Sequence, residues 1–337
     1  MNIKEIGGEE GFIERLRSTH AGAIGDGLIL GIGDDAAIFE TPSGLQTVVT
    51  TDMLVEDVHF RRDWSDPYSI GWKSAAVNLS DIAAMGAEPT LAFLSIAFNP
   101  EETVETLDRI YDGFSDCLNR YGARLAGGDT NSTSGGMVIS VTLMGSVPAG
   151  QAFIRSGARP GDVLLVTGSL GDSAAGLILL QEYGLPKAEK VDKDVLNQHR
   201  RPQPRVMASR VLAQSGQVRA AMDLSDGLLT DLNKLCAASQ VGARIDTGRL
   251  PISSAVRNAA KMLDKDPILL ALQGGEDYEL LLAVAPENVD DVIEAVTAAG
   301  TPLTAIGEVL KSGRRIVAPD GESDLDPGEG GWDHFAQ

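Results

Sequence analysis

Strand-like and helix-like segments alternate along the chain, and the alternation occurs in both halves. Short runs rich in Val, Ile and Thr are followed by segments with helical apolar spacing. In the first half, strands are expected at 45–51, 90–98 and 137–147, and helices at 11–20, 67–85 and 100–121. In the second half, strands are expected at 162–167, 220–224, 280–284 and 306–309, and helices at 172–183, 204–215 and 227–238. This pattern predicts an α/β (mixed α+β) fold.

The length also indicates more than one folding unit. A chain of 337 residues is long enough for two domains of ordinary size. A stretch bounded by Pro and Gly at 148–157 separates the two alternating halves, so we expect domains at 1–149 and 150–337. Residues 320–331 are rich in Gly, Asp and Glu and predict an exposed loop.

The charge excludes some classes of partner. Asp and Glu number 48 and Lys and Arg number 28, which gives a formal net charge of −20. Nucleic acids and anionic membranes would be repelled by such a surface. If the substrate is a phosphate ester, something other than the protein surface must supply positive charge.

The cysteines and the N-terminal segment favour the cytoplasm. Cys117 and Cys236 are far apart in sequence and form no zinc-binding pattern, as expected of two buried thiols in a reducing compartment. The first residues lack the basic and apolar regions of a signal peptide. No apolar run approaches the ~18 residues needed to span a membrane.

Aspartates at the edges of apolar segments are the main candidates for chemistry. Each one taken singly is more often a turn or helix-capping residue, but seven of them recur beside Gly, Ser or Thr. Converging carboxylates repel one another unless a cation is present, and Mg²⁺ bridging phosphates suits oxygen ligands best. The residues are Asp34, Asp35, Asp52, Asp81, Asp129, Asp223 and Asp226.

Glycine-rich segments provide possible phosphate contacts. GGDT at 127–130 is expected to be a loop that allows close backbone approach. TGSLGDSAAG at 167–176 leads into a helix whose first amides could hold a phosphate, although a tight strand-to-helix turn explains it equally well. Arg155 is either a phosphate clamp or a surface residue. No P-loop or protein-kinase motif occurs, and GIGDDA lacks the following helix of a dinucleotide site.

Taken together, these motifs resemble those of the thiamine-monophosphate kinases, within the wider superfamily of aminoimidazole ribonucleotide synthetase-like enzymes. The matching motifs run in family order over nearly the whole chain: GIGDDAA, TTDMLVEDVHF, AVNLSDIAAMGAEP, GGDT, RSGARPGD, TGSLGDSAAGL, MDLSDGL, GGEDYEL and GWDHF. The resemblance implies a two-domain α/β fold and a homodimer paired through its N-terminal sheets. It makes 1–149 the ATP-binding, metal-binding and dimerisation domain. It also implies transfer from ATP to thiamine phosphate, with several Mg²⁺ ions and optionally K⁺.

The resemblance further implies a set of site residues. The implied metal ligands are Asp35, Thr50, Thr51, Asp52, Asp81, Asp129, Asp223 and Asp226. The implied ATP contacts are Tyr111, Gly128, Asp129, Arg155 and Ser225, and the implied thiamine phosphate contacts are His59, Glu276 and Trp332. Without the resemblance, His59 would be a structural histidine, Glu276 a turn residue, Tyr111 a core aromatic and Trp332 a tail anchor.

The acceptor's chemistry makes a protein base unnecessary. A phosphate ester with a second pKa of about 6 is mostly a dianion at pH 7, so we expect direct in-line transfer with no catalytic residue acting as a base. The nearest alternatives are other enzymes of the superfamily. Selenophosphate synthetase would need a reactive Cys near the N-terminus, and aminoimidazole ribonucleotide synthetase would not be expected to carry GWDHF. A noncatalytic Ca²⁺-binding protein is the alternative of another class, but EF-hand spacing is absent.

Overall fold

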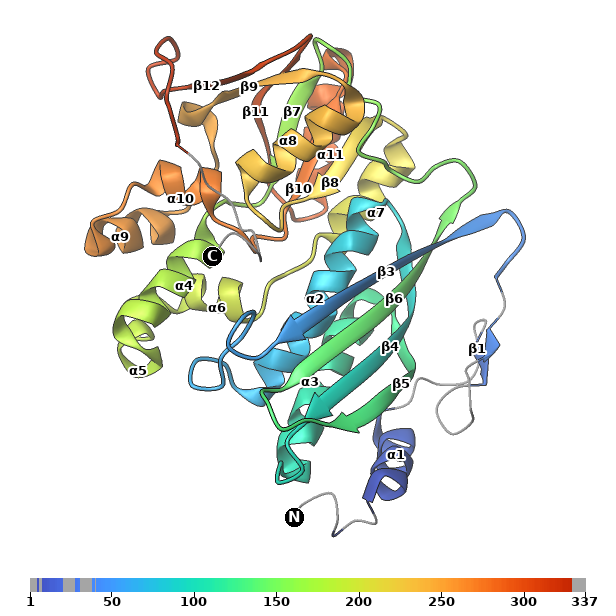
Figure 1. The fold of residues 1–337 in the computed structure, drawn as a ribbon. Coiled ribbons are helices and arrows are strands. Elements are labelled where there is room, and N and C mark those ends of the chain that lie inside the picture. Colours follow the sequence, from blue (N-terminus) through green and yellow to red (C-terminus); the bar gives the residue numbers. More distant parts are fainter. Residues whose placement is uncertain (1–4, 6–7, 21–27, 31–37, 40, 329–337) are drawn as a thin grey trace. The chain divides into compact units, whose positions relative to one another are not determined.

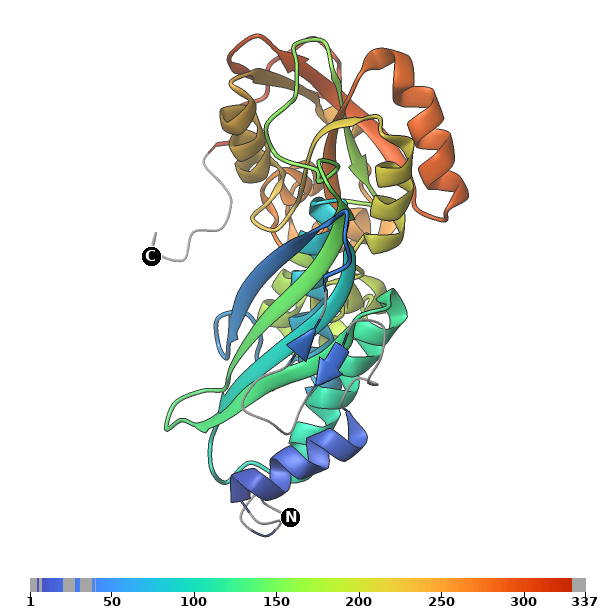
Figure 2. The ribbon, with the colours of Figure 1, turned by 90° about the vertical axis from the view of Figure 1, so that its right-hand side faces the viewer.

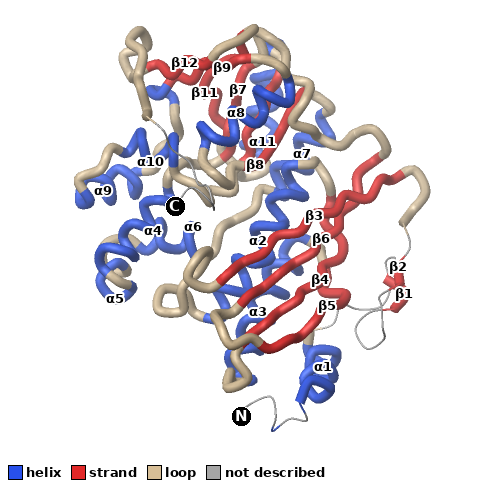
Figure 3. Tube along the Cα trace, in the orientation of Figure 1, coloured by secondary structure: helices blue, strands red, loops and turns tan. Residues whose placement is uncertain are grey.

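The computed structural model describes residues 5, 8–20, 28–30, 38–39 and 41–328 (Figure 1). It divides into two compact units. Unit 1 contains Met1–Ile82 and Ala87–Gly150, and unit 2 contains Ala83–Gly86 and Gln151–Gln337. Both units combine helices with a sheet of mixed parallel and antiparallel strands, as Figure 3 shows in blue and red, which confirms the expected fold class.

A four-stranded sheet in the order β3-β6-β4-β5 forms the centre of unit 1. Helices α2 and α3 cover one of its faces (Figure 1). The elements of this unit are α1 (Gly8–Thr19), β1 (Leu28–Leu30), β2 (Ile38–Phe39), β3 (Leu45–Val55), α2 (Pro67–Ala84), β4 (Glu88–Phe98), α3 (Val104–Tyr121), β5 (Arg124–Ser132) and β6 (Val138–Pro148).

Two glycines allow α2 and α3 to pack backbone against backbone. A Cβ at Gly71 would lie 1.8 Å from the Ile110 carbonyl oxygen, and one at Gly113 would lie 1.9 Å from the Tyr68 carbonyl oxygen. Either substitution would push the helices apart, because real Cβ atoms do not approach so closely. The two glycines therefore set how closely α2, the helix that carries Asp81, approaches α3.

Unit 2 has three layers around a six-stranded sheet in the order β12-β9-β11-β7-β10-β8. Helix α8 lies on one face and α7 and α11 lie on the other (Figure 2). The elements are β7 (Val163–Thr167), α4 (Asp172–Tyr183), α5 (Leu185–Ala188), α6 (Lys193–Arg200), α7 (Val206–Ser215), β8 (Val218–Asp223), α8 (Leu228–Ser239), β9 (Gly242–Asp246), η2 (Thr247–Arg249), α9 (Ser254–Leu263), α10 (Pro267–Gln273), β10 (Leu280–Val284), η3 (Pro286–Asn288), α11 (Val289–Ala298), β11 (Leu303–Leu310) and β12 (Arg314–Val317).

Three expectations about local structure were wrong. GGDT is not a loop, because β5 continues through it to Ser132 and pairs with β4. Asp52 lies inside β3 and not at its end, because pairing with β6 extends that strand to Val55. The third helix begins at Val104 and not at Pro100, because the Thr103 side chain accepts a hydrogen bond from the Thr106 amide and caps it there.

Among the described residues, no helix is both long and apolar enough to cross a membrane.

Candidate active site

An acidic pair forms where β3 faces α2 in unit 1. Thr50 and Asp52 share one face of β3, since alternate residues of a strand point the same way. The Thr50 hydroxyl oxygen lies 2.5 Å from Asp81 Oδ2, to which it donates a hydrogen bond. Burial, the negative charge of Asp81 and a hydrogen bond with Asp81 together raise the pKa of Asp52 from 3.8 to about 6.

The donor set of this pair fits a hard cation. Two carboxylates and a hydroxyl offer oxygen ligands, which Mg²⁺ prefers. Burial and the charge of Asp81 both oppose ionisation of Asp52, and a bound cation would relieve this repulsion. In the part of the chain that the structure describes, no three His, Cys, Asp or Glu side chains come together as a metal site.

Thr51 differs from its two neighbours. Its side chain alternates to the other face of β3, and its hydroxyl donates to the Val141 carbonyl oxygen at 2.9 Å. The structure therefore brings Thr50, Asp52 and Asp81 together but directs the Thr51 hydroxyl elsewhere.

Gly128 and Asp129 lie on β5, the opposite edge of the same sheet. A Cβ at Gly128 would lie 1.9 Å from the Leu94 carbonyl oxygen, so a glycine is needed where β5 meets β4. Asp129 is exposed and is aligned with Ser95 of β4. Burial raises the pKa of Tyr111, and the negative charge of Asp129 raises it further. Tyr111 itself is only 2% exposed and packs edge-on against Phe12.

Asp52 and Asp129 cannot hold the same ion within one sheet. Strands β6 and β4 lie between them. At about 4.8 Å per strand, their backbones are about 14 Å apart, whereas oxygens around one Mg²⁺ bond to it at only about 2.1 Å. Within one chain the two aspartates therefore suit different ions.

His59 has a defined tautomer. The Val55 amide donates to His59 Nδ1 at 3.1 Å, so the Nδ1 lone pair is occupied and the ring proton of neutral His59 sits on Nε2. His59 is half-buried, and its backbone is held by Lys73, whose ammonium donates to the His59 carbonyl oxygen at 2.9 Å. In the neutral ring, Nε2 is therefore the nitrogen that donates.

The second aspartate cluster lies in unit 2, where β8 leads into α8. Asp223 ends β8 and is 5% exposed. The amides of Ser225 and Asp226 both donate to Asp231 Oδ2 at 3.0 Å, which fixes the turn between strand and helix. Lys234 donates to Asp226 at 2.5 Å and to Asp231 at 2.8 Å. Asp226 therefore has a cationic partner from its own chain.

The turn that carries Glu276 is held against this cluster. The Glu276 amide donates to the Ser225 carbonyl oxygen at 2.7 Å, and the Tyr278 amide donates to Leu224 at 2.9 Å. Glu276 and Tyr278 both have left-handed backbones, with φ of 64° and 51°. A non-glycine residue is held in this region only where the surroundings determine it, and such residues are common at ligand sites.

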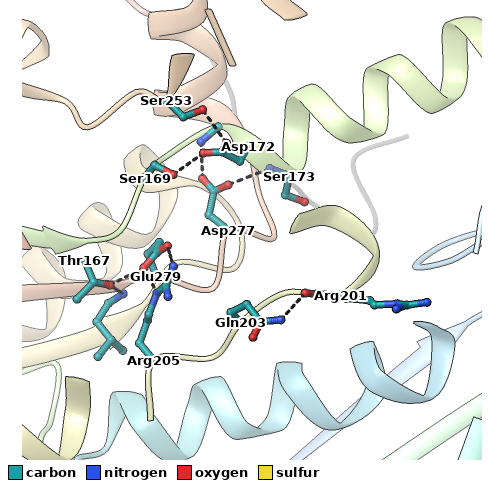
Figure 4. A network of polar contacts seen from close by, with 12 residues as sticks. Thr167, Ser169, Asp172, Ser173, Arg201, Gln203, Arg205, Ser253, Asp277 and Glu279 are labelled. Atoms are coloured by element: carbon teal, nitrogen blue, oxygen red, sulfur yellow. Dashed lines mark hydrogen bonds and ion pairs between the residues drawn. The ribbon is translucent and has the colours of Figure 1, made fainter. Parts of the chain in front are cut away.

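The first amides of α4 are not open to a phosphate. The Gly171 and Ser173 amides donate to the Asp277 carboxylate at 2.7 and 3.2 Å, and Figure 4 shows Asp277 directed at the start of this helix. Burial raises the pKa of Asp277 well above its usual range. The structural explanation of the 167–176 segment, a tight strand-to-helix turn, therefore holds for these two amides.

The remaining sequence candidates lie in loops or outside the described part. Arg155 is exposed, and its carbonyl oxygen accepts a hydrogen bond from Ser239 at 2.8 Å. Asp34, Asp35 and Trp332 lie outside the described residues.

Comparisons with known proteins decide the family. Residues 33–147 match AIR synthase related protein, N-terminal domain, and residues 159–318 match the C-terminal domain. The chain is 40% identical over 329 residues to thiamine-monophosphate kinase of Escherichia coli O157:H7, with 96% of each chain covered. It is 39% identical over 309 residues to that of Bacillus subtilis (strain 168), covering 91% of this chain and 93% of the relative. The chain belongs to the thiamine-monophosphate kinase family.

Solved structures of thiamine-monophosphate kinases share the fold. The structure from Stenotrophomonas maltophilia K279a has a TM-score of 0.80 and 37% identity, and the match covers 92% of this chain and 95% of that one. A structure described as AaThiL complexed with AMPPCP and TMP has a TM-score of 0.76 and 33% identity over 99% of both chains. That relative thus binds an ATP analogue and TMP.

Sequence reasoning missed the side chains that hold the candidates in place. Asp231, Lys234, His199 and Asp277 were not singled out, although each contacts a candidate residue or its turn. Asp231 had a usable signal, because an Asp in the first turn of a helix after SDG can cap the preceding turn. His199 had none, since it lies 77 positions from its partner Glu276.

Proposed function

We propose that this protein transfers the γ-phosphoryl group of ATP to thiamine phosphate, which yields ADP and thiamine diphosphate. The supporting observation is its similarity, over more than nine-tenths of both chains, to enzymes named thiamine-monophosphate kinase. The relative that binds AMPPCP and TMP supports the same two substrates.

Acidic residues in both units are proposed to hold the Mg²⁺ ions. Asp52, Asp81 and Thr50 supply one oxygen cluster, and Asp129 contributes at the other sheet edge. Asp35, Thr51, Asp223 and Asp226 complete the proposed set. When bound, Mg²⁺ neutralises phosphate charge and aligns donor with acceptor. Lys234 contacts one oxygen of the Asp226 carboxylate, Oδ2, and would compete with an ion for that oxygen. A K⁺ ion remains part of the proposal.

The chain's own groups then bind and orient the two substrates. Five residues are proposed to contact ATP: Gly128, Asp129, Tyr111, Arg155 and Ser225. Tyr111 is only 2% exposed, so we expect it to support the ATP contacts through its packing.

His59, Glu276 and Trp332 are proposed to contact thiamine phosphate. His59 donates from Nε2, because Val55 occupies Nδ1. No residue is required to remove a proton, since the acceptor phosphate is mostly a dianion at pH 7. One of its oxygens forms a bond to the γ-phosphorus as the bond to the β–γ bridging oxygen breaks, and ADP leaves.

The proposal also includes a homodimer and a cytoplasmic location. The outward face of β3 carries Val49 and Met53, which are 58% and 55% exposed, so a second copy could cover apolar surface there. Cys117 and Cys236 are both free thiols, as in proteins of a reducing compartment.

An acceptor panel tests the function. The purified protein would be incubated with ATP, Mg²⁺ and either thiamine phosphate, thiamine or an aminoimidazole ribonucleotide precursor, with products identified by mass spectrometry. We expect thiamine phosphate to be converted to thiamine diphosphate and neither of the other two acceptors to be phosphorylated. Phosphorylation of free thiamine at a similar rate, or no transfer to thiamine phosphate, would contradict the proposal.

A further inference from the structure

A buried histidine faces the carboxylate of Glu276. His199 Nδ1 lies 3.2 Å from Glu276 Oε2 and 3.1 Å from the Ser173 hydroxyl oxygen. The His199 side chain is 6% exposed, whereas that of Glu276 is 25% exposed. The carboxylate is therefore reachable by a ligand on one side and is held by an imidazole on the other.

Close helix packing places His199. It lies in the last turn of α6, which packs against α4. A Cβ at Gly176 of α4 would lie 2.3 Å from the Val195 carbonyl oxygen and 3.2 Å from His199 Cβ. The glycine lets the two helices meet at this point, which brings the imidazole within reach of both Ser173 and Glu276.

The backbone of Glu276 is fixed from two sides. Its own amide is held by Ser225, and the next residue, Asp277, accepts hydrogen bonds from the start of α4. These bonds fix the backbone of Glu276 in its left-handed conformation. The contact with His199 restrains its side chain as well.

The chemistry of the two groups decides which one donates the hydrogen bond. An ionised carboxylate only accepts hydrogen bonds, so Nδ1 must carry a proton to approach Oε2 favourably. Ser173 Oγ lies within reach of the same nitrogen and can share that proton as a second acceptor. The pair therefore keeps Glu276 as an oriented acceptor for an amino group or a cationic ring.

We propose that His199 is a positioning residue, which orients the Glu276 carboxylate toward the ring portion of the substrate. This inference rests on the proposed function, because it takes thiamine phosphate as the ligand of Glu276. Thiamine phosphate offers both an aminopyrimidine and a cationic thiazolium. ATP binding does not depend on the contact.

Three substitutions at position 199 separate positioning from packing. His199→Asn places an amide N–H near the position of Nδ1, His199→Gln places one near Nε2, and His199→Leu has neither. Each would be made in wild type and in the Glu276→Gln background. KM for each substrate, kcat and melting temperature would be measured. Leu212→Ala, which creates a cavity in α7 of the same unit, is the matched control for lost stability.

The inference predicts a selective effect on one substrate. His199→Leu and His199→Gln should raise KM for thiamine phosphate about tenfold, the size expected for a lost hydrogen bond to a charged group. His199→Asn should stay within about threefold of wild type, and KM for ATP should not move. In Glu276→Gln, replacing His199 should add less than about a twofold change, because the two residues act as one unit.

Several results would overturn it. One is that His199→Asn and His199→Gln have equal effects, and another is that KM for ATP rises as much as KM for thiamine phosphate. A third is that the losses of the two single variants multiply in the double variant of His199 and Glu276. A fourth is that Leu212→Ala raises KM for thiamine phosphate by the same factor. If His199→Leu does not fold, the comparison of Asn with Gln still decides the question. A wild-type protein that does not phosphorylate thiamine phosphate overturns the proposed function and the inference with it, whereas an active wild type with additive effects overturns the inference alone.

Discussion

Replacing Asp52 with Asn should stabilise the metal-free protein while destroying its activity. In the folded protein Asp52 keeps its proton up to about pH 6, because burial and Asp81 oppose its ionisation, whereas the unfolded chain loses that proton near 3.8. The folded state thus binds more protons between these values, and the free energy of unfolding falls as pH rises through this window. Above pH 6 the folded protein carries the full free-energy cost of ionising Asp52 in its buried site.

The magnitude follows from the pKa difference. At about 1.4 kcal/mol for each pH unit, the interval from 3.8 to about 6 corresponds to about 3 kcal/mol. Asn has nearly the same shape and no proton to lose. Asp52→Asn should therefore raise the free energy of unfolding by up to about 3 kcal/mol at pH 7, but by less than about 1 kcal/mol at pH 4.

Urea unfolding in EDTA at pH 4 and pH 7 measures this difference, with the fluorescence of buried Trp72 reporting on the same unit. The matched control is Asp57→Asn, which removes a carboxylate that is 80% exposed at a left-handed position that Asn tolerates. Adding Mg²⁺ and ATP should stabilise Asp52→Asn less than wild type, and should leave the variant without turnover. The reasoning fails if Asp52→Asn is less stable than wild type at pH 7 in EDTA, or if it gains the same stabilisation from Mg²⁺ and ATP.

Three further predictions concern single substitutions. Asp129→Asn should abolish turnover, because transition-state stabilisation of the order of several kcal/mol is lost, and it should leave the melting temperature unchanged. A near-normal rate with saturating Mg²⁺ would show that Asp129 is not a metal ligand. His59→Gln should raise KM for thiamine phosphate more than it lowers kcat, because the Val55 amide already donates to His59 Nδ1. A loss confined to kcat, with an altered pH profile, would show that His59 acts as a base. Trp332→Ala should raise KM for thiamine phosphate about tenfold and Trp332→Tyr much less, since an aromatic face attracts the cationic ring. An equal rise in KM for ATP would instead indicate that Trp332 anchors the C-terminal tail.

The sequence predicted the fold class because strand and helix periodicities are local. The helices at 67–85 and 172–183 and the strand at 280–284 were found nearly to the residue, since apolar spacing and flanking Gly or Pro mark them. The extent of β5 was missed, because glycines weaken a strand pattern and only the fit of Gly128 against Leu94 shows why they stand there.

The candidate site was predictable by residue type but not by geometry. Recurrent aspartates pointed to Asp52 and Asp81, and the structure brings this pair together through α2 and β3. The sequence could not show that β6 and β4 separate Asp52 from Asp129, because strand order is set by tertiary packing. Partners such as Lys234 for Asp226 are likewise visible only once the fold is known.

Direct transfer between the two substrates is the central claim, and the fate of the γ-phosphate tests it most directly. With ATP labelled in that group, the rate at which label enters thiamine diphosphate would be compared with the rate of ADP release. The account predicts one label in thiamine diphosphate for each ADP, with none bound to the protein at any time in a rapid-quench series. Label on the protein before product appears, or ADP release that leaves the label in inorganic phosphate, would contradict it.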